Sequence, residues 1–268
     1  MEMGLGELYL GGMTRDQALA FARAARPSDP TGANQSARPH APATSDRRDP
    51  SGAERSARPR APAVADRRAP AAPDGPAVAL PVLPDSYDEV RGLALGCTRC
   101  RLADGRKNVV FSDGPVDARL IVVGEAPGAN EDETGLPFVG AAGKFLDLLL
   151  ATVDLSREDS VYICNVLKCR PPGNRNPLPD EIDTCSPYLH KQIELVRPQA
   201  LLAVGSFSAK LLTGQPDAAL GKLRGKVHSY RGVPLVVTYH PAALLRNANW
   251  TRAFWDDLQL LRGVMDAT

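Results

Sequence analysis

The chain has 268 residues, and 43% of them are hydrophobic, which is enough for a sizeable core. Its formal net charge of +1 excludes a protein that binds nucleic acid through bulk positive charge, so any such contact requires a local basic patch. No run of about 18 or more apolar residues occurs, and the start of the chain resembles no secretory signal, so we expect no membrane span and a cytoplasmic location.

The composition divides the chain into three segments, namely residues 1–26, 27–82 and 83–268. Residues 14–25 predict a short amphipathic helix in the first segment. The second segment is crowded with Pro, Ala, Arg and Asp, and it contains a tandem duplication, 31–50 followed by 51–70. Such a sequence cannot bury enough apolar surface to offset its ordering entropy, so we predict a disordered linker. It is either an inert spacer or a weak arm for DNA or a partner that the sequence does not identify.

The third segment alternates strand and helix patterns. In chain order, we predict a helix over 86–96, a buried strand running into a glycine-rich turn over 118–128, a helix over 143–153, a strand over 160–168, a helix over 179–196, a strand over 199–205, a helix over 206–214, a hairpin over 225–241 and a closing helix over 249–265.

This alternation predicts an α/β fold, with a mostly parallel sheet covered by helices on both faces. Ligands of such folds bind outside the carboxyl ends of the strands. Three polar motifs lie at predicted strand ends: GEAPG at 124–128, Asn165 with the following KCRPPGN, and HPA at 240–242. We therefore expect these motifs to meet at one site.

Four of the five cysteines are candidate metal ligands. Cys97 and Cys100 form a C-x-x-C pair, Cys169 follows a predicted strand, and Cys185 lies in the next predicted helix. Zinc and a 4Fe–4S cluster both accept four thiolates, and the spacing alone does not distinguish them. Cys164, inside a predicted strand, is interpreted as a buried small side chain.

Several segments of this part of the chain, taken together, resemble the family 4 uracil-DNA glycosylases, which carry a 4Fe–4S cluster. The matching segments are CTRC at 97–100, GEAPGANEDETGLPFVGAAG at 124–143, ICNVLKCRPPGNRNPLPDE at 163–181, Cys185, and HPAALLRN at 240–247. They occur in order across roughly residues 86–265, while residues 1–82 lie outside the resemblance.

The resemblance implies a three-layer α/β/α sandwich around a short, mostly parallel sheet. It also implies that the four cysteines hold a 4Fe–4S cluster, with zinc as the second choice. The implied activity belongs to base excision repair: the protein flips uracil out of single- or double-stranded DNA, hydrolyses its N-glycosidic bond and leaves an abasic site. We expect a monomer that associates with the nucleoid.

The chemistry of uracil fits the residues at the strand ends. Uracil presents an acceptor at O4 and a donor at N3, and one Asn amide can pair with both, whereas cytosine has the inverse pattern. By resemblance, Asn165 reads the base, Phe138 stacks on it, and Gly124, Glu125 and Ala126 line the pocket.

Cleavage of the glycosidic bond places negative charge on the base and positive charge on the sugar. By resemblance, His240 and Glu125 are the catalytic residues, with His240 as donor to uracil O2. Whether its imidazole is neutral or protonated stays open, as does the exact role of Glu125. Glu131, the second acidic candidate, and Asn174 also match the family motif and are possible catalytic or supporting residues.

An apolar wedge and several cations would complete the contact with DNA. The candidates are Lys168, Arg170, Arg175, Leu244, Leu245 and Arg246.

Three other interpretations are weighed. The first is a catalytically silent iron–sulfur or zinc module that binds DNA or a partner. The second is a phosphate-binding turn, although GEAPG matches neither common phosphate-loop pattern. The third is a related group that traps uracil covalently through a histidine after the second strand, but KCRPPGNRNPLP contains none, so we expect turnover.

Overall fold

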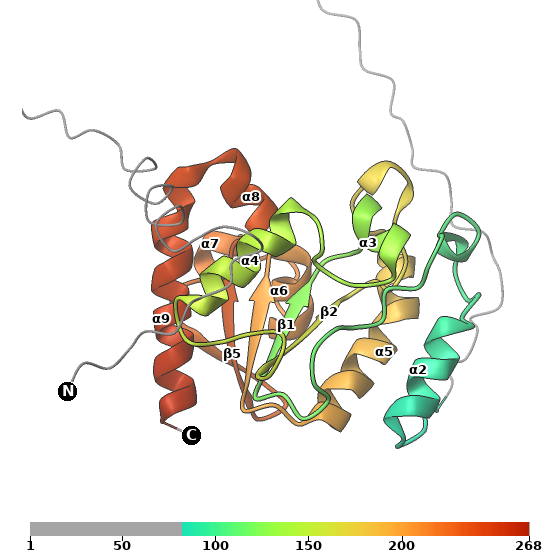
Figure 1. Cartoon of the computed structure of the whole chain (residues 1–268), viewed down its shortest axis with the longest axis horizontal. Coiled ribbons are helices and arrows are strands. Elements are labelled where there is room, and N and C mark those ends of the chain that lie inside the picture. Colours follow the sequence, from blue (N-terminus) through green and yellow to red (C-terminus); the bar gives the residue numbers. More distant parts are fainter. Residues whose placement is uncertain (1–81, 268) are drawn as a thin grey trace, which may run out of the picture. The chain divides into compact units, whose positions relative to one another are not determined.

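The computed structural model describes residues 82–267. They form a five-stranded sheet, and helices cover it (Figure 1). The helix predicted over 14–25 and the linker predicted over 27–82 lie outside the described residues, apart from Val82. The strands are β1 Leu120–Gly124, β2 Val161–Asn165, β3 Ala200–Val204, β4 Val227–Tyr230 and β5 Val233–Thr238.

The strand order is β2-β1-β3-β5-β4, and every pair is parallel except β4 with β5. The antiparallel pair is the predicted hairpin, and its turn falls at Arg231 and Gly232. Strands β1, β2 and β3 are buried along their whole length, which explains their continuous apolar sequences.

Helices pack on both faces of the sheet. Neighbouring residues of β1 alternate, so that Ile121 joins a core on the side of α5 and α6, whereas Leu120 joins a core on the side of α4 and α9. The bounds of these helices are α4 Ala141–Ala151, α5 Pro179–Val196, α6 Ser206–Thr213 and α9 Thr251–Asp266. The described residues thus form the predicted three-layer α/β/α sandwich.

A separate small helix packs against the outside of α5. This helix, α2 Tyr87–Leu95, begins after the N-cap Ser86 and ends at Gly96, as predicted. Its buried Val90 and Ala94 contact Tyr188 of α5. Figure 1 shows α2 beside α5. Because Cys97 follows the C-cap of α2, this packing brings the first pair of cysteines near α5, where Cys100 acts electrostatically on Cys185.

The structure differs from the prediction in two respects. The strand predicted over 160–168 ends at Asn165, and the amides of Val166 and Leu167 donate instead to the carbonyl oxygens of Gly124 and Glu125. Several short helices, too short to show a hydrophobic period, were not predicted. They are η1 Arg101–Ala103, α3 Ala129–Thr134, η2 Pro172–Asn174, α7 Leu220–Leu223, α8 Pro241–Arg246 and η3 Ala248–Trp250.

The helices found within residues 82–267 do not include one that is both long and apolar enough to cross a bilayer. The four parallel strands end along one edge of the sheet, where α3 and α8 also begin. The polar motifs predicted at strand ends therefore meet at this edge.

Candidate active site

A cleft of about 700 Å³ opens at the carboxyl edge of the parallel strands. All three predicted motifs contribute to it, through Glu125 and Ala126 after β1, Asn165 at the end of β2, and His240 after β5. Further predicted residues also line it, namely Glu131, Phe138, Asn174, Arg175 and Arg246. The structure therefore places the two most important predicted side chains, Asn165 and His240, in a common cavity.

Asn165 lies at the floor of the cleft and is 2% exposed. Its Oδ1 has no hydrogen-bond partner among residues 82–267. A buried polar atom without a partner is costly unless a ligand satisfies it. The Asn165 amide is thus available to a molecule that enters the cleft.

Gly124 allows the recognition groups to come together. A Cβ atom at this position would lie 2.2 Å from Asn165 Oδ1 and 2.6 Å from Phe138 Cζ. Both distances are shorter than real contacts, so any side chain at residue 124 would displace the amide or the ring. Gly124 does not line the cleft but lies buried behind these two side chains.

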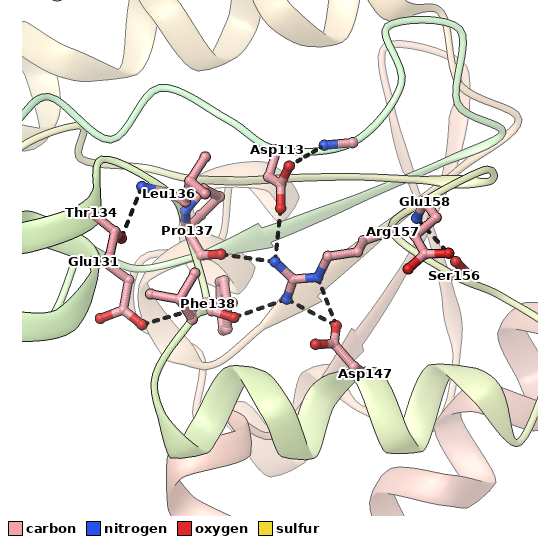
Figure 2. A network of polar contacts seen from close by, with 12 residues as sticks. Asp113, Glu131, Thr134, Leu136, Pro137, Phe138, Asp147, Ser156, Arg157 and Glu158 are labelled. Carbon is pink, nitrogen blue, oxygen red and sulfur yellow. Dashed lines mark hydrogen bonds and ion pairs between the residues drawn. The ribbon is translucent and has the colours of Figure 1, made fainter. Parts of the chain in front are cut away.

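The backbone of Phe138 adopts a left-handed conformation, with φ of 54°. This region is unfavourable for a bulky residue and persists only where the surroundings enforce it. Figure 2 shows Arg157 donating to the carbonyl oxygens of Pro137 and Phe138, at 3.1 and 2.8 Å, while it also pairs with Asp113 and Asp147.

Gly143 completes this arrangement, because its own Cβ would lie 1.7 Å from Phe138 O. The first turn of α4 therefore approaches the loop so closely that position 143 admits no side chain. The ring of Phe138 is held against the cleft from several directions, and it stacks on His240 with ring centroids 5.5 Å apart.

Glu131 holds the same loop by hydrogen bonds to its backbone. Its Oε1 accepts from the amides of Val139 and Gly140 at 3.0 and 2.9 Å, and its Oε2 accepts from Gly128 at 3.1 Å. The carboxylate thus joins the GEAPG turn to the loop of Phe138. Its acceptor capacity is largely used within the protein, which favours a structural role over the catalytic one considered above.

The Arg157 network gives a first prediction. In the Arg157→Met protein, the free energy of unfolding should fall by about 3 kcal/mol, because two partly buried carboxylates and two carbonyl oxygens lose their partner. Chemical denaturation measures the change. Arg252→Met is the matched control, since the Arg252 side chain is 79% exposed, forms an exposed ion pair with Asp256 and lies over the ring of Trp255, so its loss should cost less than about 1 kcal/mol. Equal effects of the two substitutions would contradict the assignment.

His240 is the N-cap of α8, and its Nδ1 accepts a hydrogen bond from the amide of Ala242 at 3.2 Å. Burial lowers the pKa of His240 to about 4, and the positive charge of Arg246 acts in the same direction, against an opposing effect of Glu131. The imidazole is therefore neutral at neutral pH. Because Nδ1 accepts, the proton is on Nε2, which can donate to a ligand.

Glu125 faces the cleft from the turn after β1. Burial raises the pKa of its carboxyl group, and no side-chain or backbone donor within residues 82–267 counteracts this effect. An unpaired carboxylate with a raised pKa is a stronger base than an exposed one. Of the two acidic candidates, Glu125 is the one whose carboxylate remains available.

The four predicted cysteine ligands lie near one another. Burial is the main reason that the pKa of the Cys185 thiol is raised to about 12; Lys168 opposes this effect, and the nearby Cys169 and Cys100 act in the same direction as burial. Burial also raises the pKa of Cys169, as do Cys97 and Cys100. Arg106 joins two of them, donating to Cys97 O at 2.6 Å and to Cys169 Sγ at 3.4 Å.

Within residues 82–267, no three His, Cys, Asp or Glu side chains are grouped as one metal ion would require. Zinc held by four thiolates at about 2.3 Å requires sulfur atoms in close contact. The four thiols share a neighbourhood without this compact geometry. Cys164 is fully buried inside β2, as predicted.

Two predicted DNA contacts are wrong. Lys168 is 2% exposed, and its Nζ donates to Asn165 O at 2.8 Å and to Gln192 Oε1 at 2.5 Å, so its charge points inwards. Leu244 is 2% exposed and belongs to the core beneath α4 and α9, so it cannot act as a wedge. The next residue, Leu245, is 52% exposed and lies on the outer side of α8.

The other predicted cations lie at or near the surface. Arg246 is exposed and lines the cleft. Arg170 donates to Asn174 Oδ1 at 2.7 Å, and Arg175 forms two hydrogen bonds with the buried Glu181. Asn174 and Arg175 therefore belong to a loop fixed to the start of α5, at one side of the cleft.

Several residues of the site were not predicted. Arg157 belongs to the loop before β2 and matches no motif, and Tyr239 and Trp250 line the cleft although neither was considered. Tyr239 directly precedes His240, so its position at a strand end was an available signal. Trp250 and Arg157 had no comparable signal in the sequence.

Comparison with known proteins agrees with this site. A family model described as the uracil DNA glycosylase superfamily matches residues 111–259, more than half of the chain. The chain therefore belongs to the uracil DNA glycosylase superfamily.

The chain is also similar to individual proteins named type-4 uracil-DNA glycosylase. It is 40% identical over 185 residues to the one from Sulfurisphaera tokodaii, covering 66% of this chain and 84% of the relative. It is 43% identical over 178 residues to the one from Pyrobaculum aerophilum, covering 64% and 90%. It is 45% identical over 152 residues to the one from Thermotoga maritima, covering 56% and 79%. Within the superfamily, the chain is thus a member of the type-4 uracil-DNA glycosylases.

Proposed function

We propose that the cleft holds a uracil flipped out of DNA and that the chain hydrolyses its N-glycosidic bond, releasing uracil and leaving an abasic site. The observation that carries the proposal is the buried Asn165 amide, whose Oδ1 has no partner among the described residues, in the cleft that also contains Glu125, Phe138 and His240. Enzymes that act on a base in DNA bind it outside the helical stack.

Asn165 supplies the recognition. Its Oδ1 accepts from uracil N3–H, and its Nδ2 donates to O4, so uracil satisfies the atom that has no partner among residues 82–267. Cytosine presents an acceptor at N3 and a donor at the exocyclic amine, opposite to this arrangement.

His240 stabilises the leaving group. As the C1′–N1 bond breaks, its electron pair passes to uracil N1, and negative charge spreads to O2. The neutral imidazole donates Nε2–H to O2, since Nδ1 is occupied by the amide of Ala242. This geometry supports the neutral form of the two considered above.

Glu125 acts on the sugar and on the attacking water, whereas His240 acts on the base. As a carboxylate it stabilises the positive sugar and orients the water whose oxygen bonds to C1′. The water proton passes to the carboxylate and finally to the solvent or to uracil. A pKa raised by burial favours this proton transfer. Glu131 is less suited, because its oxygens accept three backbone hydrogen bonds.

Leu245 and Arg246 are well placed for DNA. Leu245 is exposed on α8 and can enter the gap left by the flipped base. Arg246, exposed at the rim of the cleft, can bind a phosphate of the same strand.

We favour a 4Fe–4S cluster over zinc as the group that the four cysteines hold, because the segments around them resemble the family 4 enzymes. In a cluster, the thiolates bind different iron atoms, so their sulfur atoms lie further apart than around one ion. The thiols influence one another electrostatically, which agrees with four cysteines near enough to share one group. Cys97, Cys100, Cys169 and Cys185 would hold the cluster, which would supply a rigid link between the loop of residues 169–185 and the segment after α2.

The cluster gives a second prediction. The Cys169→Ser protein should lose most of its iron and acid-labile sulfide, together with the brown colour of the wild type, and it should unfold at a lower temperature. Cys164→Ala is the control, because Cys164 is equally a buried thiol but lies inside β2, and it should retain the iron. If the purified wild type contains zinc and no iron, the cluster assignment is wrong.

Uracil excision itself is tested with a labelled oligonucleotide that contains one uracil. Treatment with alkali after incubation cleaves the strand at abasic sites. We expect cleavage at uracil, none with thymine or cytosine at that position, and strongly reduced cleavage by Glu125→Gln. A folded wild-type protein that binds this DNA without cleaving it would instead support the silent DNA-binding module.

A further inference from the structure

Three flat side chains form a stack beside the cleft. The rings of Tyr239 and Trp250 are nearly parallel, with centroids 4.7 Å apart and planes inclined by 13°. The guanidinium carbon of Arg224 lies 4.0 Å from the centroid of the Tyr239 ring. Two groups cannot share one face of a ring at these distances, so Arg224 and Trp250 occupy opposite faces of Tyr239.

The inner end of this stack is rigidly fixed. Arg224 donates through Nε to Asp257 Oδ2 at 2.7 Å and through Nη2 to Ala253 O at 2.5 Å. Asp257 is 2% exposed and also accepts from the amide of Gly225. Arg224 is therefore held on α9, and its charge serves to position Tyr239 rather than to contact solvent.

The outer end of the stack is Trp250, which is 39% exposed. A large aromatic side chain supported on one face and open to solvent can accept another flat group. Tyr239 and Trp250 line the same cleft as Asn165 and His240. Arg246 lines that cleft too and adds a positive charge for a phosphate.

We propose that Trp250 is the stacking platform of a second base subsite, which takes a nucleobase next to the flipped uridine on the same strand. The proposal rests on the function inferred above, since it is the flipped uridine that brings its neighbours to the rim. Every base has an aromatic face, so the subsite accepts all four. In a duplex, the neighbouring base is paired and stacked, so the platform acts on single-stranded DNA.

The test measures affinity for a single-stranded oligonucleotide whose uracil nucleotide is 2′-fluoro-2′-deoxyuridine, which resists hydrolysis. In further oligonucleotides, an abasic tetrahydrofuran unit replaces the nucleotide on either side. We expect Trp250→Ala to weaken binding of the complete oligonucleotide by about 5-fold to 100-fold. It should have little effect on one of the abasic oligonucleotides, and Trp250→Phe should retain most of the affinity.

Trp255→Ala is the matched control, because Trp255 is 37% exposed and does not line the cleft. It should bind every oligonucleotide like the wild type. Binding of Trp250→Ala to the duplex form should change less than binding to the single strand.

Fluorescence gives a second measure of stacking on Trp250, in a protein that retains this residue. The chain has two tryptophans, so in Trp255→Phe the emission comes from Trp250 alone. The complete oligonucleotide should quench this emission, and the abasic one should not. Equal weakening of all oligonucleotides by Trp250→Ala, or the absence of quenching, would show that Trp250 merely packs against Tyr239.

Excision of deoxyuridine by the wild type is measured in parallel, and it tests the proposed function separately. If uracil is excised but binding does not depend on the neighbouring base, the proposed subsite is wrong and the proposed function stands. If binding depends on the neighbouring base but uracil is not excised, the proposed function is wrong and the cleft is a site that binds single strands.

Discussion

The His240→Ala protein is expected to show a kcat about 10² to 10³-fold below that of the wild type, the usual cost of removing one donor from a developing anion. Its affinity for DNA should change little, because the donor acts on charge that is absent before the bond breaks. Single-turnover excision, together with binding to the 2′-fluoro oligonucleotide, separates the two effects. A loss of affinity as large as the loss of rate would mean that His240 binds DNA rather than the leaving group.

The protonation state of His240 gives this prediction a second measurement. Since burial lowers its pKa to about 4, the imidazole stays neutral as the pH rises from about 6 to about 8. The wild-type rate should therefore show no decrease in this interval with the midpoint of an ordinary histidine. A catalytic imidazolium would instead lose activity as the pH rises through its pKa.

In the Asn165→Asp protein, the ratio of kcat/KM for uracil to kcat/KM for cytosine should fall by about 10⁴-fold. Most of this fall should come from slower excision of uracil. The aspartate cannot donate to O4 when ionised, and it places a charge at a position that is only 2% exposed, close to Gly124. The measurement is kcat/KM on oligonucleotides that contain uracil or cytosine. Asn249→Asp is the control, since Asn249 is exposed, does not line the cleft and should retain the preference.

If Asn165→Asp kept the wild-type preference, the amide would not be the reader of the base. A thermal unfolding curve for the same protein tests whether the substitution merely destabilises the fold. Loss of activity with an unchanged curve locates the effect in the cleft.

Much of the fold follows from local signals in the sequence. The bounds of α5, 179–196, were predicted to the residue because Pro179 stands at its first position and the apolar residues keep a helical period. Asn165 and His240 were found because parallel strands carry their ligands at one edge. Long, regular elements and the residues at their ends are thus readable from the sequence.

The wrong predictions concern the direction in which a side chain points, because the residues next to it in the sequence do not determine this direction. Lys168 was assigned to DNA because it belongs to a polar loop, yet the chain turns so that its Nζ reaches Asn165 O and Gln192. Leu244 and Leu245 are equally apolar, and only the packing of α8 on the core shows that the first points inwards. The role of Arg157 depends on a loop that is distant in sequence and close in space.

The contacts that fix the loop of Phe138 determine when this loop becomes ordered. Arg157, Glu131 and Gly143 fix the loop without any help from a nucleotide. Its entropy is therefore lost once, when the polypeptide folds, and not again at each encounter with a damaged strand. When the excised base departs, it leaves a receptor of unchanged shape, ready for the next lesion.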